Sequence, residues 1–204
     1  NVPNEFIESY FPLRIERYET IRDSGGAGLH RGGNGLSVAY RFLADGEIGI
    51  HDERWLMHPW GVLGGDTGQR STKRLVRADG SEQWLPAKVE GVKVKAGDLL
   101  YFNTWGGGGW GDPYARDSEL VRADVDRRLV SVEGARRYGV VIASDGSVDA
   151  AQTEALREQL RAGRSEDQPL FNRGGTIDEI KARCLEETHL PPPVTPQFPS
   201  EAQA

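Results

Sequence analysis

Residues 23–35 read DSGGAGLHRGGNG, and residues 105–113 read WGGGGWGDP. Glycine reaches backbone conformations that other residues avoid and lets a second backbone or a ligand approach closely, although ordering it costs more entropy. Both runs lie directly beside strand-like sequence, which indicates built architecture rather than a linker. We therefore expect tight turns and close backbone packing in both runs.

The sequence around these runs has the alternation of half-buried strands. Residues 36–42 (LSVAYRF) and 47–51 (EIGIH) alternate larger apolar residues with smaller or polar ones. The Asp45-Gly46 turn between them predicts that the two strands pair as a hairpin. Residues 92–102 predict two short strands around an Ala-Gly-Asp corner. This spacing is typical of all-β sandwiches and barrels.

The pattern becomes helical after residue 117. Ser118 and Ser131 are placed to cap short helices, and Gly139 to close the second. Asp149 opens a helix over 150–164, rich in Ala, Leu, Glu and Arg.

Two features close this part of the chain. A short apolar strand is predicted over 140–143. A capping box at 176–179 predicts a last helix, with Ile177, Ile180 and Cys184 as its apolar stripe.

These patterns predict an α+β fold in three parts. We expect a β-rich, sandwich- or barrel-like glycine-loop domain over 1–117. A mainly helical segment over 118–190 packs on it, and an extended Pro-rich tail covers 191–204.

Composition narrows the classes of function. The 204 residues carry a net charge of -6 and no Lys/Arg-rich run, which argues against nucleic acid. No apolar stretch approaches the length of a membrane span, and the polar N-terminus is not a signal peptide. One cysteine, Cys184, excludes an internal disulfide framework and fits a reducing cytoplasm. Because the first residue is Asn1, we expect this sequence to be a piece of something larger.

The residues alone provide no catalytic constellation. Neither glycine run ends in the Gly-Lys-Ser/Thr of a phosphate loop, and no His-x-x-x-His or Cys-x-x-Cys spacing indicates a metal. His51 ends a predicted strand and His58 precedes a proline, so we expect both at the surface or in turns. Cys184 is expected to be a small buried hydrophobe. No nucleophile elbow, Gly-x-Ser-x-Gly, is present.

Tryptophans and polar residues beside glycines are the candidate contacts. Trp105 and Trp110 flank four glycines, and a flat ring next to glycine can wall a substrate pocket or plug an interface. Four charged residues in glycine-rich turns are expected to anchor those turns, with contact to substrate or to another subunit as the alternative. The candidates for substrate-pocket or subunit contact are Asp23, Arg31, Asp66, Trp105, Gly107, Gly108, Trp110 and Asp112.

Several segments together resemble the C-terminal part of the hydantoinase B/oxoprolinase family. PLRIERY leads into residues 23–35, which match that family's "dSGGaGrxRGGxG" stretch. PWGVLGGDTG (59–68) and GGGGWGDP (106–113) follow. The remaining matches are Arg116-Asp117, Val121, Asp124-Val125, Val130-Ser131, Ala135 and residues 138–141. The matches lie in the right order over about residues 1 to 143.

The resemblance implies a heteromeric ATP-dependent enzyme. Such proteins work with a second, ATP-binding subunit or domain of the hydantoinase A type, and the pair activates an amide or carbonyl by phosphorylation. The pair then hydrolyses cyclic amides (hydantoins, 5-oxoproline, lactams) or carboxylates ketones such as acetone and acetophenone. The family's metal-binding His and Asp residues lie upstream of the glycine run, so no metal ligand and no catalytic residue is carried over to this sequence.

Three hypotheses follow. The first is the C-terminal portion of a B-type subunit of a cytoplasmic ATP-dependent cyclic-amide hydrolase, its partners being the A-type subunit, the N-terminal part of the B-type subunit and a small cyclic amide. The second is the equivalent subunit of a ketone carboxylase. The third is a non-catalytic assembly module. In each, we expect ATP/Mg and a divalent metal to bind elsewhere in the complex, and this chain alone to be inactive.

Overall fold

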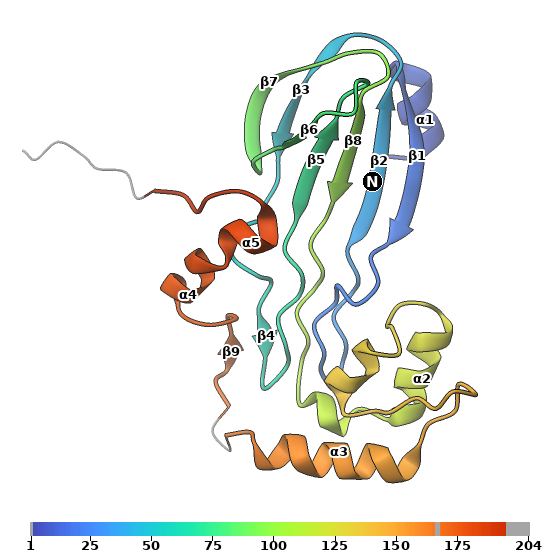
Figure 1. Ribbon diagram of the computed structural model, residues 1–204, viewed down its shortest axis with the longest axis vertical. Coiled ribbons are helices and arrows are strands. Elements are labelled where there is room, and N and C mark those ends of the chain that lie inside the picture. Colours follow the sequence, from blue (N-terminus) through green and yellow to red (C-terminus); the bar gives the residue numbers. More distant parts are fainter. Residues whose placement is uncertain (1, 166–167, 195–204) are drawn as a thin grey trace, which may run out of the picture.

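An antiparallel five-stranded sheet forms one end of the molecule in this computed structural model, which describes residues 2–165 and 168–194 (Figure 1). Its strand order is β1-β2-β8-β5-β6, so β1 and β6 are its edges. The five strands are β1 (Leu13–Thr20), β2 (Leu36–Phe42), β8 (Leu99–Asn103), β5 (Thr72–Val76) and β6 (Glu82–Trp84). A short helix, α1 (Asn4–Tyr10), precedes β1 and contacts it.

A two-stranded sheet of β3 (Gly46–His51) and β7 (Lys88–Val94) shares a core with the larger sheet. Alternation along β2, β5 and β8 directs one face of each strand into that core, as period-2 patterning requires. The core consists of Phe42, Ile50, Leu75, Leu85, Val94 and Leu100. Residues of both sheets thus pack into one core, consistent with an α+β fold. The open order of the larger sheet contains two edges, so the sheet is not closed into a barrel.

The predicted strands exist, but the predicted hairpin is wrong. β2 pairs with β1 and β8, whereas β3 pairs with β7. The turn at 45–46 therefore moves the chain from one sheet to the other. A local turn signal cannot distinguish this from a hairpin, because the choice depends on strands that arrive later in the sequence.

Below the sheet, three glycine-rich segments form what we call the glycine bundle: residues 23–35, 59–69 and 104–112 (Figure 1). Each segment hydrogen-bonds to both others through its backbone. Gly26 N–H donates to Gly107 O (2.8 Å), Asp66 N–H to Ala27 O (2.7 Å) and Gly109 N–H to Asp66 O (2.9 Å). The three chains thereby satisfy their backbone polar groups without a regular sheet.

The bundle explains the glycines. A Cβ built on Gly32 or Gly108 would lie closer than 3.0 Å to backbone atoms of a neighbouring segment. Side chains are excluded because the backbones themselves are in contact. The expected close backbone packing of the glycine runs is therefore confirmed.

The end of the bundle that lies away from the sheet is covered by helices. They are η1 (Pro113–Ala115), α2 (Ser118–Asp126), η2 (Gly134–Tyr138) and α3 (Ala150–Ala162). Asp149 caps α3 as predicted, accepting from Gln152 N–H (2.9 Å). Asp117 rather than Ser118 caps α2, and Gly139 ends η2 with φ 66°. A second core joins these elements to the bundle through Ala27, Val121, Val130, Ala135, Tyr138 and Val140.

The predicted strand over 140–143 is wrong. In the structure this segment forms only an isolated bridge, between Ile142 and Val148. Val140 is fully buried in the second core, and its apolar neighbours pack there rather than in a sheet.

The segment that follows α3 returns alongside the bundle, and we call residues 171–190 the C-terminal arm. It comprises β9 (Phe171–Asn172), which pairs with β4 (Gly61–Val62), then α4 (Ile177–Ala182) and α5 (Cys184–Thr188). The capping box of Thr176 and Glu179 is present as predicted. Ile180 and Cys184 are fully buried, but Ile177, the first residue of α4, is 47% exposed.

Two predictions concern the ends and the membrane. Residues 191–194 of the predicted tail have no regular secondary structure, and residues 195–204 lie outside the described residues. Within the described part of the chain, no helix is both long and apolar enough to cross a bilayer.

Candidate functional site

Most of the residues singled out from the sequence lie in or beside the glycine bundle, where they hold segments together. Asp23, at φ 62°, accepts from Ser131 N–H (2.8 Å), and its carbonyl accepts from Arg137 (2.9 Å). Asp112 caps η1 by accepting from Tyr114 N–H (3.0 Å) and binds Arg164 (2.6 Å). These carboxylates tie the bundle to the helices beneath it.

Arg31 lies in a buried ionic cluster. Its Nε is 3.3 Å from Asp124, which also binds Arg116 (2.9 Å). Arg31 donates further to Asn34 (2.7 Å) and to Gly32 O (2.8 Å). This side chain joins the first glycine segment to α2.

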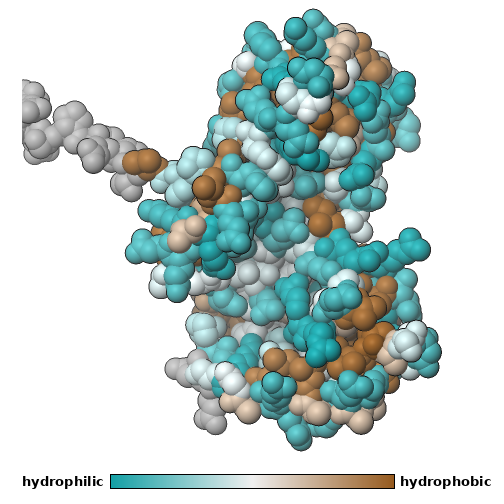
Figure 2. Space-filling view, in the orientation of Figure 1, coloured by the Kyte–Doolittle hydropathy of each residue, from teal (hydrophilic) through white to brown (hydrophobic). Residues whose placement is uncertain are grey.

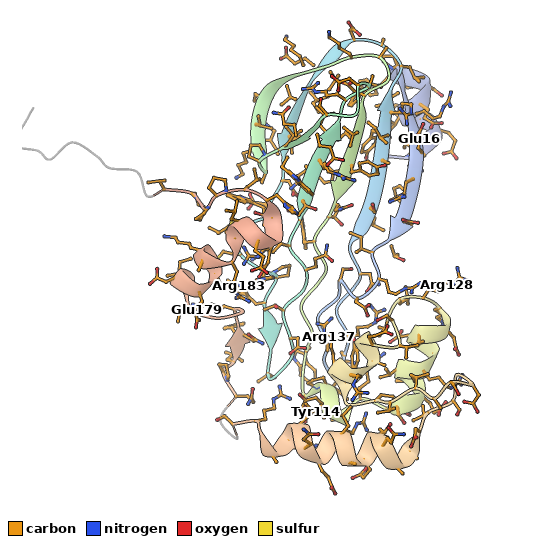
Figure 3. The ribbon with its side chains drawn as sticks, in the orientation of Figure 1. Glu16, Tyr114, Arg128, Arg137, Glu179 and Arg183 are labelled. Atoms are coloured by element: carbon orange, nitrogen blue, oxygen red, sulfur yellow. The ribbon has the colours of Figure 1, made fainter. Side chains whose placement is uncertain are left out.

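Asp66, on the second glycine segment, is a candidate carboxylate whose pKa is raised. Burial raises its pKa, and the nearby Arg137 guanidinium (3.7 Å away) and Arg164 oppose that rise. Figure 3 labels Arg137 and Tyr114, which lie where the bundle meets the helices.

The two tryptophans are separated. Trp105 is 38% exposed near the sheet, where a Cβ built on Gly35 would lie 2.9 Å from its carbonyl oxygen. Trp110 is 45% exposed at the other end, with its ring 5.3 Å from that of His30. Gly107 and Gly108 lie inside the bundle, bonded or packed against the other segments. The structure therefore does not bring the eight candidates into one site.

A different group of side chains converges where the C-terminal arm meets the bundle, and we call it the His58–Arg70 cluster. It consists of His58, Arg70 and Glu187. Arg70 Nε lies 3.0 Å from His58 Nε2 and 2.7 Å from Glu187 Oε2, and Arg70 Nη2 donates to Ile180 O (3.3 Å). The Arg70 side chain is 2% exposed.

The hydrogen bonds determine the form of His58. Its Nδ1 lies 3.0 Å from the carbonyl oxygen of Gly68, which can only accept, so Nδ1 carries a proton. Nε2 then accepts from Arg70 in the neutral ring. Burial lowers the pKa of His58, with the Gly68 carbonyl and Glu187 opposing and Arg70 reinforcing the effect. Since the lone pair on Nε2 is engaged by Arg70, the ring positions Arg70 rather than acting as a free base.

A cavity of about 350 Å³ opens beside this cluster. Its walls include Gln69, Thr72 and the stacked pair of Trp84 and His189, whose ring centroids are 4.0 Å apart. Of the cavities in the described residues, this one places a histidine, a buried arginine and a glutamate on a single wall. It is therefore our candidate for contact with a small polar molecule.

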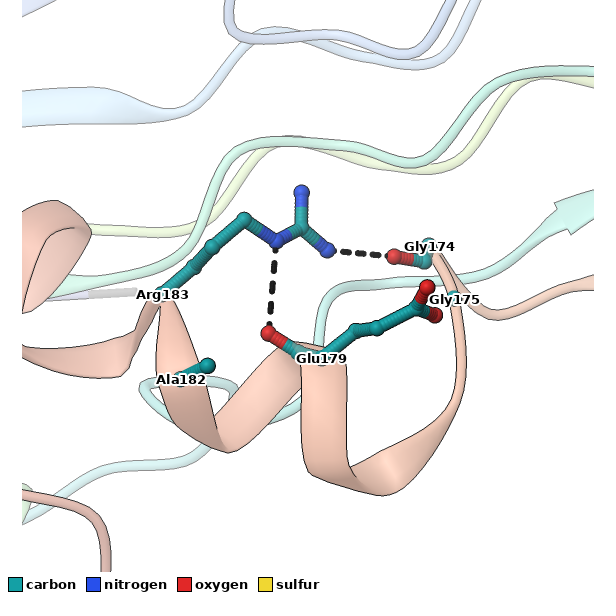
Figure 4. Close-up of a pocket in the computed structure, with 5 residues that line it drawn as sticks. All are labelled: Gly174, Gly175, Glu179, Ala182 and Arg183. Carbon is teal, nitrogen blue, oxygen red and sulfur yellow. Dashed lines mark hydrogen bonds between the residues drawn. The ribbon is translucent and has the colours of Figure 1, made fainter.

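A second cavity, of about 480 Å³, lies within the arm (Figure 4). Its lining residues bond to each other: Arg183 donates to Gly174 O and, at 3.4 Å, to Glu179 O. Glu179 in turn accepts from Thr176 in the capping box. These polar groups are therefore engaged with one another at the surface of the arm.

The expectation that His58 lies at the surface or in a turn is wrong. Its side chain is 12% exposed, whereas His51 ends β3 and is exposed, as predicted. Cys184 is buried, as predicted. No motif in the sequence marks the His58–Arg70 cluster, because Glu187 and Arg70 come together only through the fold of the arm.

Metal ligation has no geometric basis in the part of the chain that the structure describes. No group of three or more His, Cys, Asp and Glu side chains there could hold a metal ion. These side chains do not fit the divalent metal that the resemblance implies, and we assign none to them.

His58 makes stability depend on pH. A histidine whose pKa is lower in the folded state binds protons more readily when unfolded, so stability rises with pH up to the ordinary value near 6.5. We expect the free energy of unfolding to fall between pH 7 and pH 5 in the parent and to fall less in His58→Gln. Denaturant unfolding at each pH measures this, and equal pH dependence in the two proteins would contradict it.

Similarity to known proteins identifies the class to which this chain belongs. Residues 1–113 match the family model described as hydantoinase B/oxoprolinase. This α+β chain with a glycine bundle belongs to that family. Caprolactamase subunit beta of Pseudomonas jessenii is 37% identical over 160 residues, covering 75% of this chain and 27% of that protein.

Two solved structures share the fold. The crystal structure of ATP-dependent caprolactamase from Pseudomonas jessenii superposes with a TM-score of 0.63 at 32% identity, over 76% of this chain and 28% of that one. Nucleotide-free acetone carboxylase gives a TM-score of 0.66 at 22% identity, over 82% of this chain and 27% of that one, which shows a common fold. The chain spans about a quarter of the length of these relatives.

Proposed function

We propose that the chain is the C-terminal portion of a B-type subunit in an ATP-dependent cyclic-amide hydrolase, working with an ATP-binding A-type subunit. The observation that carries this is the 37% identity to a caprolactamase subunit beta, which is supported by the shared fold of ATP-dependent caprolactamase. Caprolactam is a cyclic amide, so the substrate class follows from that relative.

Within this enzyme, the chain has a structural role and contributes no reactive group. The glycine bundle is a rigid platform, since its three backbones are bonded to each other without intervening side chains. The His58–Arg70 cluster fixes the arm against it and forms one wall of a small cavity. ATP with Mg²⁺ and a divalent metal bind elsewhere in the proposed complex, which is cytoplasmic.

The decisive assay uses the complete protein with the subunits that co-purify. We expect ATP hydrolysis to depend on a cyclic amide such as a lactam, a hydantoin or 5-oxoproline, and not to require bicarbonate. ATP hydrolysis that requires both a ketone and bicarbonate would instead identify a ketone carboxylase. This is the alternative function, and acetone carboxylase has the same fold as this chain.

The isolated chain is expected to show neither ATPase nor amidase activity in the same assays. The complete complex serves as the positive control. Measurable turnover by the chain alone would contradict the proposal that its reactive groups lie on other polypeptide.

A purely bridging role is tested separately. Trp105→Ala and Trp110→Ala remove two part-exposed rings from opposite ends of the bundle. A pocket wall predicts lost turnover in an intact complex. Lost assembly with unchanged intrinsic activity would instead indicate a non-catalytic assembly module.

A further inference from the structure

We propose that the cleft between the end of β1 and the end of α2 binds the phosphate groups of a small molecule. Figure 2 shows the outline of the molecule indented between the sheet and the helices at the opposite end. The cleft holds about 700 Å³, within the range of small-molecule sites. Its lining residues are Arg17, Glu19, Thr20, Ile21, Arg22, Ser37, Asn103, Arg127 and Arg128.

The four arginines come from separate parts of the chain. Arg17 lies on β1, Arg22 follows that strand, and Arg127 and Arg128 follow α2 (Figure 3 labels Arg128). Only the tertiary fold brings them to one cleft. All four side chains are exposed, so water screens their mutual repulsion, and the cleft presents a positive field that an anion can neutralise.

The turn that carries Arg128 is held in place. Arg128 has φ 60°, a conformation that non-glycine residues rarely adopt. Its carbonyl accepts from Arg22 Nε (3.4 Å), and the next carbonyl, of Leu129, accepts from Asn34 Nδ2 (2.8 Å) and Asp23 N–H (3.1 Å). The backbone beneath the guanidinium groups is thus fixed to the glycine bundle before any ligand arrives.

The charge of the cleft opposes that of the chain. Glu19 is the one carboxylate in its lining and lies 3.3 Å from Arg17. Among the described residues, Arg22, Arg127 and Arg128 form no ion pair, so the lining carries three net positive charges on a chain of net charge -6. A local field of this sign attracts anions even though the whole chain repels them.

Phosphate suits this lining better than an acidic peptide does. Each phosphate carries a charge of about -1.5 to -2 near neutral pH and several acceptor oxygens. Guanidinium groups bind such oxygens in pairs, and the hydroxyls of Thr20 and Ser37 supply further donors. A volume of about 700 Å³ with four arginines in its lining favours a small molecule with two or more phosphates.

The test measures binding of pyrophosphate to the purified chain, with any subunits that co-purify, by titration calorimetry at low ionic strength. We expect saturable binding that weakens as salt is raised. Arg127→Gln should weaken binding about tenfold through loss of one charge-assisted contact. In the described structure the Arg127 side chain lines the cleft and is exposed, so this variant should fold normally, as circular dichroism can verify.

Arg136→Gln is the matched control, because it removes an exposed arginine of η2 that does not line the cleft. It should bind pyrophosphate like the parent. Equal weakening by both variants, no saturable binding, or equally tight binding of citrate would overturn the proposal. So would an acidic peptide that binds and is not displaced by pyrophosphate. None of these results depends on which reaction the complete enzyme catalyses.

Discussion

Gly32→Ala is expected to destabilise the protein by about 3 kcal/mol or more, or to prevent folding, whereas Gly33→Ala should be nearly neutral. A Cβ on Gly32 would lie closer than 3.0 Å to the backbone of Gly107 and Gly108, and backbone atoms in a bonded bundle cannot move aside. A Cβ on Gly33 meets nothing within 4 Å. Urea unfolding followed by circular dichroism measures both.

Gly33→Ala is the matched control for Gly32→Ala. Both variants add one methyl group to the same segment and reduce the entropy of the unfolded chain similarly. Only the packing against the segment 104–112 differs. Equal stability of the two variants would contradict the close-packed bundle, and a severe loss in Gly33→Ala would do the same.

Arg70→Ala is expected to cost about 2–4 kcal/mol and to release the C-terminal arm. The change removes a buried guanidinium that bonds His58, Glu187 and the carbonyl of Ile180, and it leaves His58 Nε2 and the Ile180 carbonyl without that donor. Limited proteolysis should then cut within 171–190 well before the rest of the chain. Hydrogen exchange of α4 and α5 should rise in parallel.

Arg183→Ala is the control for that experiment. Arg183 lies 3.6 Å from the same Glu187 and also donates to the carbonyls of Gly174 and Glu179 within the arm. Its side chain is 44% exposed, so water can replace these contacts and their loss costs about 0–1 kcal/mol. Cleavage should stay close to that of the parent. If the two arginines had equal effects, the buried cluster would not be what holds the arm.

Much of the fold could be predicted where the signal is local. The strand over 36–42, the cap at Asp149 and the capping box at Thr176 each depend on residues a few positions apart, and each is present. The sequence near the turn could not exclude a β2–β3 hairpin. In the structure β2 pairs with β1 and β8, and β8 lies more than fifty residues later in the chain. Ile177 is exposed at the start of α4, although Ile180 and Cys184 on the same predicted stripe are buried.

The site was less predictable than the fold. The sequence directs attention to the glycine runs and their tryptophans, but Trp105 and Trp110 end up apart. The His58–Arg70 cluster has no spacing to reveal it, because Arg70 bonds a carbonyl 110 residues away. The arginines of the phosphate cleft are equally scattered along the chain.

The sequence by itself determined that the backbones of its glycine-rich segments come into contact, and which family has the same glycine-rich segments. Glycine is the residue that permits such contact, and the positions of the glycines are known from the sequence alone. Only the tertiary structure decided which backbones touch and which charged side chains meet around them. Those contacts depend on the order of strands in the sheet and on how the C-terminal arm packs against the bundle. Both are set by residues far apart in the chain, so no short sequence pattern indicates them.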